Sequence, residues 1–406
     1  MVERMTIGTE FSAPGHYRDA FAVREFRVMF AAYVVSMLGI VVAGLALTVQ
    51  VYDRTGSSLL SALTFTLSFL PFLFGGTLLS GLVDRIPPRR LLAGCDLLSA
   101  ALVAVMALPG LPIAVLLVLL FCMNLSAPLA VGTRSALLPE IMPPGAVVPA
   151  RSLFRMVAQT AQICGYAAGG GLLAGLAPRD VLLVDAFALA AAAAVIRFGL
   201  RHHDPVGPAR AGSLARDSLG GIRDVLARPA LRRVLLLTWL VPFFACAPEA
   251  LAAPAAAHLG LPSSAAGWWL TAIPVGTVAG ELAGVLFLPA AWRRRLVRPF
   301  AACCFLPLIV FIAQPELPLA LTLLVLAGTG AAYTLGLDQL LLEVTPAELR
   351  GRAFTVSTAG LMTLQGLGFA AAGALGEVMT PFAVIVTAGC AGLIVVAALR
   401  TPAAAR

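Results

Sequence analysis

Twelve apolar stretches, each about long enough to cross a bilayer, run along this chain and leave most charged residues between them. An α-helix needs about 20 apolar residues to span the hydrocarbon layer. Only 12% of the 406 residues are charged, about half the share of a soluble domain. The sequence therefore predicts an all-α polytopic membrane protein in a lipid bilayer, with spans at residues 28–51, 58–82, 91–109, 112–134, 148–176, 180–200, 232–256, 265–290, 298–314, 318–342, 353–376 and 380–399.

The arginines predict how these spans are oriented. The chain has 28 arginines and no lysine, and all of them except Arg54 and Arg179 fall on one side when the loops are counted alternately. Basic loops are retained in the cytoplasm, so we expect both termini there. The shortage of Lys and Asn, with abundant Ala, Gly, Pro and Arg, indicates a GC-rich bacterial genome and hence a bacterial cytoplasmic membrane. Arginines in short loops do not form a nucleic-acid-binding face.

The chain divides into two halves that repeat. The longest break, residues 201–231, separates six spans from six, and its pattern around 219–226 suits an amphipathic helix at the membrane surface, although a solvated linker is an alternative for 201–218. A shift of 203 residues aligns rarer residue types without gaps, for example Glu140 with Glu343 and Gln162 with Gln365. Two related six-span halves are a common layout of secondary transporters.

Several motifs resemble one known family. The loop after the second span reads Ser80-Gly81-Leu82-Val83-Asp84-Arg85-Ile86-Pro87-Pro88-Arg89-Arg90, and the fifth span contains Gly165-Tyr166-Ala167-Ala168-Gly169-Gly170-Gly171. The first is similar to the signature loop of the major facilitator superfamily. The second is similar to a glycine motif of its drug–proton antiporters, with Tyr166 where that motif has proline. With Tyr52 to Ser57 and Arg134 to Glu140, these segments resemble the bacterial branch that exports drugs, macrolides and siderophores.

The resemblance implies the major facilitator fold, with twelve transmembrane helices in two pseudo-symmetric six-helix bundles. We expect a cytoplasmic N-terminal segment (1–27), a first bundle (28–200), a cytoplasmic linker (201–231), a second bundle (232–399) and a cytoplasmic tail (400–406). It also implies a monomeric secondary transporter that exports a small, partly hydrophobic molecule by alternating access, in exchange for protons. We expect no enzyme activity, cofactor, metal or nucleic-acid partner.

The resemblance and the charge pattern also assign gating and packing residues. In the family the loop Asp lies against the start of the eleventh span, where Arg350 and Arg352 would stabilise Asp84; an ordinary solvated loop is the alternative. Arg134 and Asp338 occupy near-equivalent places in the two halves and are predicted to be salt-bridge partners at the inner gate. The predicted gating residues are Asp84, Arg85, Arg89, Arg134, Asp338, Arg350 and Arg352, and the predicted helix-packing glycines are Gly165, Gly169, Gly170, Gly368 and Gly373.

Acids inside the spans are the candidates for proton coupling, because a charge in hydrocarbon is costly and usually faces a cavity or a partner. Glu281 lies deepest and is the first choice, with hydrogen-bonded helix packing as the alternative. Asp96 is the second candidate, unless it pairs with a loop arginine. Glu249 and Asp185 lie toward the outer ends of their spans, where each would meet a cationic substrate or water.

Uncharged polar residues could line a central cavity, although each could instead join helices by hydrogen bonds. They are Tyr33, Ser36, Asn124, Gln162, Tyr333 and Gln365. Trp268 and Trp269 are predicted to anchor the eighth span at the membrane interface. Two other functions stay open: uptake of a metabolite by a symporter or facilitator of the same fold, and a membrane protein that transports nothing.

Overall fold

The computed structural model describes residues 17–72, 86–143, 146–203, 227–262, 264–346 and 349–399, and these residues form helices joined by short connections. The first bundle contains α1 (Tyr17–Ala22), α2 (Arg24–Thr55), α3 (Ser58–Phe69), α6 (Pro88–Met106), α7 (Ile113–Asn124), α8 (Ser126–Ile141), α9 (Val147–Gly175) and α10 (Pro178–Gly199).

The second bundle contains more interrupted helices. They are α12 (Pro229–Ala245), α13 (Ala247–Ala250), α14 (Ala252–His258), α15 (Ala265–Phe287), α16 (Ala290–Arg295), α17 (Val297–Cys303), α18 (Leu306–Ile309), the 3-10 helix η1 (Val310–Ala313), α19 (Leu317–Thr329), the 3-10 helix η2 (Gly330–Ala332), α20 (Tyr333–Val344), α21 (Arg350–Leu375) and α22 (Pro381–Ala398).

These helices confirm the predicted all-helical membrane fold. Within the described residues, 8 helices are long and apolar enough to cross a membrane, and two shorter apolar helices cover 58–69 and 297–313. Helices α6 and α9 are 19 and 29 residues long and cover the third and fifth predicted spans. Each of the twelve predicted spans therefore overlaps a helical segment of the described residues, and the second span is described only up to residue 72. The proposed boundaries of the linker and tail, and the amphipathic helix around 219–226, lie largely outside the described residues.

Proline sets where several helices begin and where one of them breaks. Proline lies in the first turn of α6, α10, α12, α19 and α22, where its missing N–H costs no helical hydrogen bond. In the seventh span, Pro242 lies inside α12 and Pro248 opens the four-residue helix α13. This break in the regular helix carries Glu249, and a broken helix at membrane depth is tolerated where it lines a cavity.

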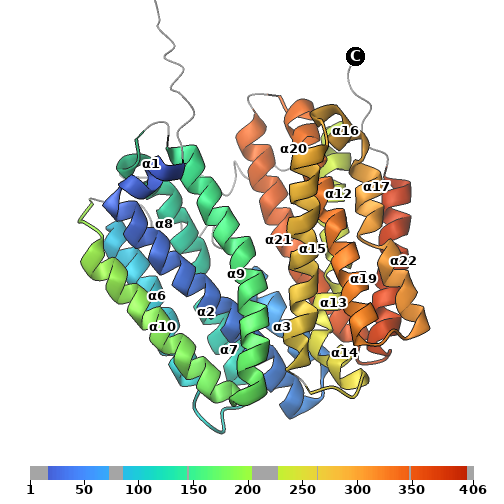
Figure 1. The fold of residues 1–406 in the computed structure, drawn as a ribbon, viewed down its shortest axis with the longest axis horizontal. Coiled ribbons are helices and arrows are strands. Elements are labelled where there is room, and N and C mark those ends of the chain that lie inside the picture. Colours follow the sequence, from blue (N-terminus) through green and yellow to red (C-terminus); the bar gives the residue numbers. More distant parts are fainter. Residues whose placement is uncertain are drawn as a thin grey trace, which may run out of the picture.

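The two bundles meet at one end and spread apart at the other, as Figure 1 shows. They meet through α3 on α21 and through α9 on α15. We call the end that contains Ser57 and Glu377 the closed end, and the opposite end the open end. Arg54 and Arg179 lie at the ends of α2 and α10 that belong to the closed end. The start of α2 and the end of α22 both lie at the open end (Figure 1).

Close packing between helices forms the core of each bundle. Alanine and leucine dominate the buried residues of both bundles. In lipid, helix association depends on close packing and not on the hydrophobic effect. The second bundle also has a buried aromatic cluster, in which Trp269 stacks on Phe382 with ring centroids 6.1 Å apart and donates a hydrogen bond from Nε1 to the Pro248 carbonyl at 2.8 Å. Trp269 is only 1% exposed, so its predicted place at the interface was wrong, whereas Trp268 is 54% exposed.

Candidate functional site

A cavity of about 540 Å³ lies against the second bundle and reaches the first bundle at Gln159 of α9. Helices α12, α15, α20 and α21 supply most of its wall. Cavities of about 300–1,000 Å³ with mainly apolar walls and a few polar groups are typical of small-molecule sites. The apolar wall residues include Val241, Pro242, Ile273, Leu308, Leu337, Leu341, Phe354 and Leu361.

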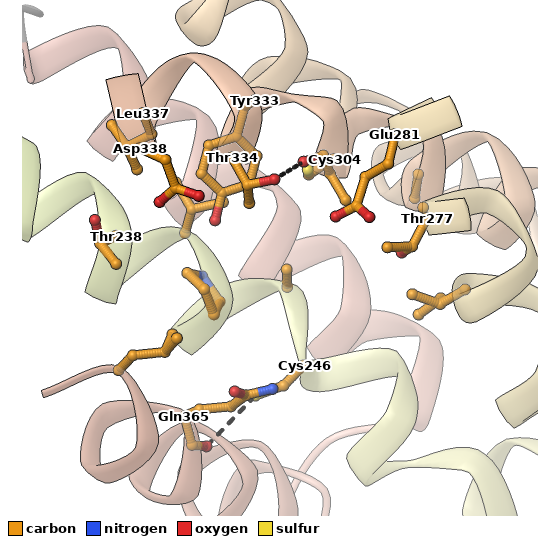
Figure 2. Close-up of a pocket in the computed structure, with 18 of the residues that line it drawn as sticks. Thr238, Cys246, Thr277, Glu281, Cys304, Tyr333, Thr334, Leu337, Asp338 and Gln365 are labelled. Atoms are coloured by element: carbon orange, nitrogen blue, oxygen red, sulfur yellow. Dashed lines mark hydrogen bonds between the residues drawn. The ribbon is translucent and has the colours of Figure 1, made fainter. Parts of the chain in front are cut away.

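Three carboxylic acids line this cavity: Glu249 of α13, Glu281 of α15 and Asp338 of α20. Figure 2 shows the side chains of Glu281 and Asp338 pointing into the same space, with Gln365 of α21 on its other side. Tyr333 also contributes to the wall and is 5% exposed. The cavity therefore joins two of the predicted coupling acids, Glu249 and Glu281, and the predicted gate residue Asp338 with two of the predicted cavity residues, Tyr333 and Gln365.

Glu249 is held at the wall by the break between α12 and α13. Its carboxylate interacts electrostatically with Tyr166 of α9 and with Cys246, the residue between α12 and α13. Within the described part of the chain, Glu249 forms no ion pair or hydrogen bond. The side chain is only partly exposed, and it lines the cavity rather than the outer surface. Glu249 therefore faces the cavity, where it would meet either substrate or water, as the two predicted alternatives require.

The other predicted polar residues lie in the first bundle, away from this cavity. Ser36 of α2 donates a hydrogen bond to Asp96 of α6 over 3.2 Å. Arg134 of α8 interacts electrostatically with Asp96 and places its Cζ atom 4.4 Å from the ring centroid of Tyr33. Tyr33 and Arg134 line a second hollow of about 450 Å³. The contacts of Arg134 that the structure describes are thus with Asp96 and Tyr33 in its own bundle, and the pairing of Arg134 with Asp338 at the inner gate stays a prediction.

Asp185 of α10 is the most enclosed of the predicted acids. It is 3% exposed, and neither carboxylate oxygen has a hydrogen-bond partner in the described structure. A side chain added at Gly39 of α2 would collide with its Oδ1 atom. The substrate-facing and water-facing alternatives both fail for Asp185, because the side chain is closed in between α10 and α2.

Two more predicted cavity residues have other surroundings. Asn124 is 7% exposed and donates to the Leu120 carbonyl of its own helix at 2.9 Å, which is a packing role. Gln162 is exposed and is absent from the wall of the cavity, where Gln159, one helical turn earlier, takes part instead. Residues three apart on a helix point in neighbouring but different directions, so the sequence located the helix but missed its rotation and hence the lining residue.

The predicted glycines lie where helix backbones come close. Gly165 and Gly169 lie against Val41 and Leu45 of α2, and Gly170 lies against Gly267 of α15, where an added Cβ would be 3.1 Å from the Gly267 Cα. In the second bundle a Cβ on Gly368 would collide with the Phe243 carbonyl oxygen, and one on Gly373 would be 2.5 Å from the Ala62 Cβ of α3. Small residues allow such close approach in lipid.

Polar and aromatic contacts complete the closed end. Glu377 Oε1 accepts a hydrogen bond from the Ser57 hydroxyl at 2.7 Å and one from the Leu59 amide at 2.8 Å. Phe369 of α21 stacks on Phe65 and Phe69 of α3, with ring centroids 5.0 and 5.5 Å apart. The Leu59 amide, which is the largest cause, and the Ser57 hydroxyl hold the pKa of Glu377 below its ordinary value. No motif in the sequence pointed to Glu377, because its partners lie more than 300 residues away along the chain.

The predicted gate at the open end is only partly described. Asp84 and Arg85 lie outside the described residues, while Arg89 lies in the first turn of α6. Helix α21 begins at Arg350, so a helix N-terminus is present where the predicted contact needs one. The contact between Asp84 and this helix stays a prediction.

Comparison with known proteins identifies the family. A sequence profile of the Major Facilitator Superfamily matches residues 29–248, more than half of the chain. The chain belongs to the major facilitator superfamily. It is therefore a multi-pass membrane protein of a family of transporters and not of enzymes.

Relatives and solved structures agree with this assignment. The enterobactin exporter EntS of Shigella boydii serotype 4 is 27% identical over 391 residues, which cover 92% of this chain and 90% of the exporter. Macrolide efflux protein A of Streptococcus pyogenes is 24% identical over 123 residues, or 29% of this chain and 30% of that protein.

The fold matches across nearly the whole chain. A bacterial homologue of the lysosomal transporter Spinster has a TM-score of 0.66 at 16% identity, covering 94% of both chains. The peptide transporter POT in complex with sulfate has a TM-score of 0.70 at 14% identity, covering 95% of this chain and 97% of that chain. The predicted major facilitator fold is confirmed.

Proposed function

We propose that this protein exports a small, partly hydrophobic molecule from the cytoplasm in exchange for protons. The observation that supports the proposal most is the acid-lined cavity between bundles that are joined at one end. A carrier needs a site that can be reached from one side while contacts close the other. The named functions of the relatives EntS and macrolide efflux protein A favour export over uptake.

In this proposal the open end faces the cytoplasm. Among the described residues, arginines such as Arg89, Arg197 and Arg294 lie at the open end, and Arg54 and Arg179 lie at the closed end. Basic loops remain on the cytoplasmic side. Substrate would then enter the cavity from the cytoplasm, and breaking the contacts around Glu377 and Phe369 would open it to the outside. Both chain termini would be cytoplasmic, and a monomer would contain the complete site.

Glu281 is the proposed coupling acid. It belongs to a spanning helix and lines the cavity that substrate would enter. A carboxyl group there is exposed to the compartment that the cavity faces, so its proton would be exchanged with one side at a time. Coupling then requires that the proton and the substrate each bind the two conformations with different affinity. Asp96, Glu249 and Asp185 are the other acids that could carry the proton.

Inside-out membrane vesicles test this function directly. Respiration acidifies the vesicle interior, and an internal pH dye reports proton release when lipophilic cations, macrolides or siderophores are added. We expect at least one compound to release protons from vesicles with the wild type, and Glu281→Gln to abolish the release. Glu316→Gln is the matched control, because Glu316 is an exposed acid at the start of α19.

The outcomes separate the parts of the proposal. Proton release that survives Glu281→Gln would keep antiport and move the coupling site to another acid. Substrate-dependent proton entry in the opposite direction would show symport and contradict export. A panel that moves no protons, although a purified transporter binds one of its compounds, would contradict proton coupling.

A further inference from the structure

We infer that the substrate of the central cavity is an amphiphilic organic cation, and that Glu249 is the counter-ion that selects it. This inference rests on the export function proposed above and adds the chemical class of the molecule. It depends on the charge of the cavity wall, on the surroundings of Glu249 and on the apolar surface beside it.

Carboxylic acids from three different helices line the cavity wall. Glu249, Glu281 and Asp338 all belong to the wall, and the described wall residues include no arginine or histidine. The chain has no lysine at all. Arg134 and Arg151 of the first bundle line a separate hollow beside Tyr33. A cation is attracted to such a wall, and an anion of the same size meets like charges.

Glu249 is the acid whose surroundings most directly indicate a positively charged ligand. Its described neighbours are the neutral side chains of Tyr166 and Cys246, and it forms no ion pair within the described chain. An isolated carboxylate at membrane depth is costly, and a proton or a cation at the same oxygen atoms removes that cost. A cationic substrate and a proton would therefore exclude one another at Glu249.

The rest of the wall suits the apolar part of such a molecule. Pro242, Ile273 and Leu337 supply apolar surface, and Tyr333 adds an aromatic side chain to the wall. Thr238, Thr277 and Ser357 add hydroxyl groups that can accept or donate hydrogen bonds. A volume of about 540 Å³ accommodates a drug-sized molecule. The acids thus select substrates by their positive charge, and the apolar wall accepts substrates of different shapes.

Two ions of nearly the same shape and opposite charge test the inference. Tetraphenylphosphonium and tetraphenylborate are titrated separately, by calorimetry, into the full-length protein in lipid nanodiscs, and the heat from empty nanodiscs is subtracted. We expect saturable one-site binding of the phosphonium and no saturable binding of the borate. Glu249→Gln should weaken phosphonium binding by at least about tenfold, because it removes the counter-ion from a desolvated pair.

Two matched variants control for folding and for total charge. Glu249→Asp keeps the carboxylate and should retain most of the binding. Glu316→Gln removes one negative charge at an exposed position outside the cavity and should leave the affinity unchanged. All variants are compared for thermal unfolding, so that a loss of binding with an unchanged midpoint reports on the site.

Three results would overturn the inference: saturable borate binding as tight as that of the phosphonium, phosphonium affinity unchanged in Glu249→Gln, or no saturable phosphonium binding to wild type. If the phosphonium fails but another compound releases protons in the vesicle assay, the substrate class is wrong and export stands. If the phosphonium binds through Glu249 but no compound moves protons, the class stands and proton-coupled export is wrong.

Discussion

Removing the carboxylate of Glu377 should destabilise the closed end by a predictable amount. Glu377 joins the end of α21 to the start of α3 through hydrogen bonds of 2.7 Å from the Ser57 hydroxyl and 2.8 Å from the Leu59 amide. Hydrogen bonds to a charged group contribute about 1.5–3 kcal/mol each when shielded from water, but exposed ionic contacts contribute only about 0–1 kcal/mol. Because Glu377 is exposed, we assign about 1–2 kcal/mol to the two bonds together.

Glu377→Ala should therefore shift the ratio of closed-end to separated conformations by about 5- to 30-fold, since 1.4 kcal/mol is a factor of ten. Spin labels at Asp180 and Val378, which lie on the two bundles at this end, would report the distance distribution in nanodiscs. The longer distance should gain population in Glu377→Ala. Glu316→Ala removes an exposed carboxylate that belongs to the second bundle alone and should change nothing.

The same contact has a defined pH dependence. The pKa of Glu377 is lowered when the closed end is formed, so its contribution is fully present above the ordinary glutamate pKa of about 4.3. The contribution is lost as the pH falls through the lowered pKa. The distances should thus stay constant between about pH 8 and pH 5 as far as Glu377 is concerned. Identical distance distributions in wild type and Glu377→Ala at neutral pH would refute the reasoning.

Three further substitutions test the packing. Gly267→Val should shift the same spin-label distances toward separation by about 1–3 kcal/mol, because its Cβ would lie 2.5 Å from the Gly170 Cα; an unchanged distribution would contradict the close crossing. Trp269→Phe should lower the thermal stability by about 1–3 kcal/mol, because the Pro248 carbonyl loses its donor; an unchanged unfolding midpoint would argue against this bond. Asp185→Asn should leave the unfolding midpoint unchanged or raise it, because the carboxylate has no described partner; a clear decrease would show that an ionised Asp185 stabilises the fold.

The sequence predicted the spans well because a bilayer imposes one strong requirement, a long apolar helix. It also singled out Tyr333 and Gln365 as cavity residues and Glu249 and Glu281 as candidate coupling acids, and all four line the cavity. It did not predict the rotation of each helix about its axis. Gln162 was expected in the cavity and Gln159 lies there instead, since apolar residues surround a membrane helix on all sides and leave no polar face to indicate its orientation.

The sequence also did not predict contacts between segments that lie far apart along the chain. Trp269 was expected at the membrane interface. It is buried instead, because it donates a hydrogen bond to the Pro248 carbonyl and stacks on the ring of Phe382. Glu377 likewise acquires its role only from α3. In both cases the partner lies far away along the chain or on another helix, so the local pattern around the residue carries no information about it.

The crossing of Gly170 over Gly267 has a mechanical consequence for a carrier of this kind. The two backbones touch there with no side chain between them. One helix can therefore roll over the other at this crossing without a change of side-chain rotamer at Gly170 or Gly267. Such a contact works as a pivot that offers little resistance in either direction. The preference for one conformation must then be set by other contacts. These are the weak polar contacts at the closed end, which the binding of a ligand or a proton in the cavity can outweigh.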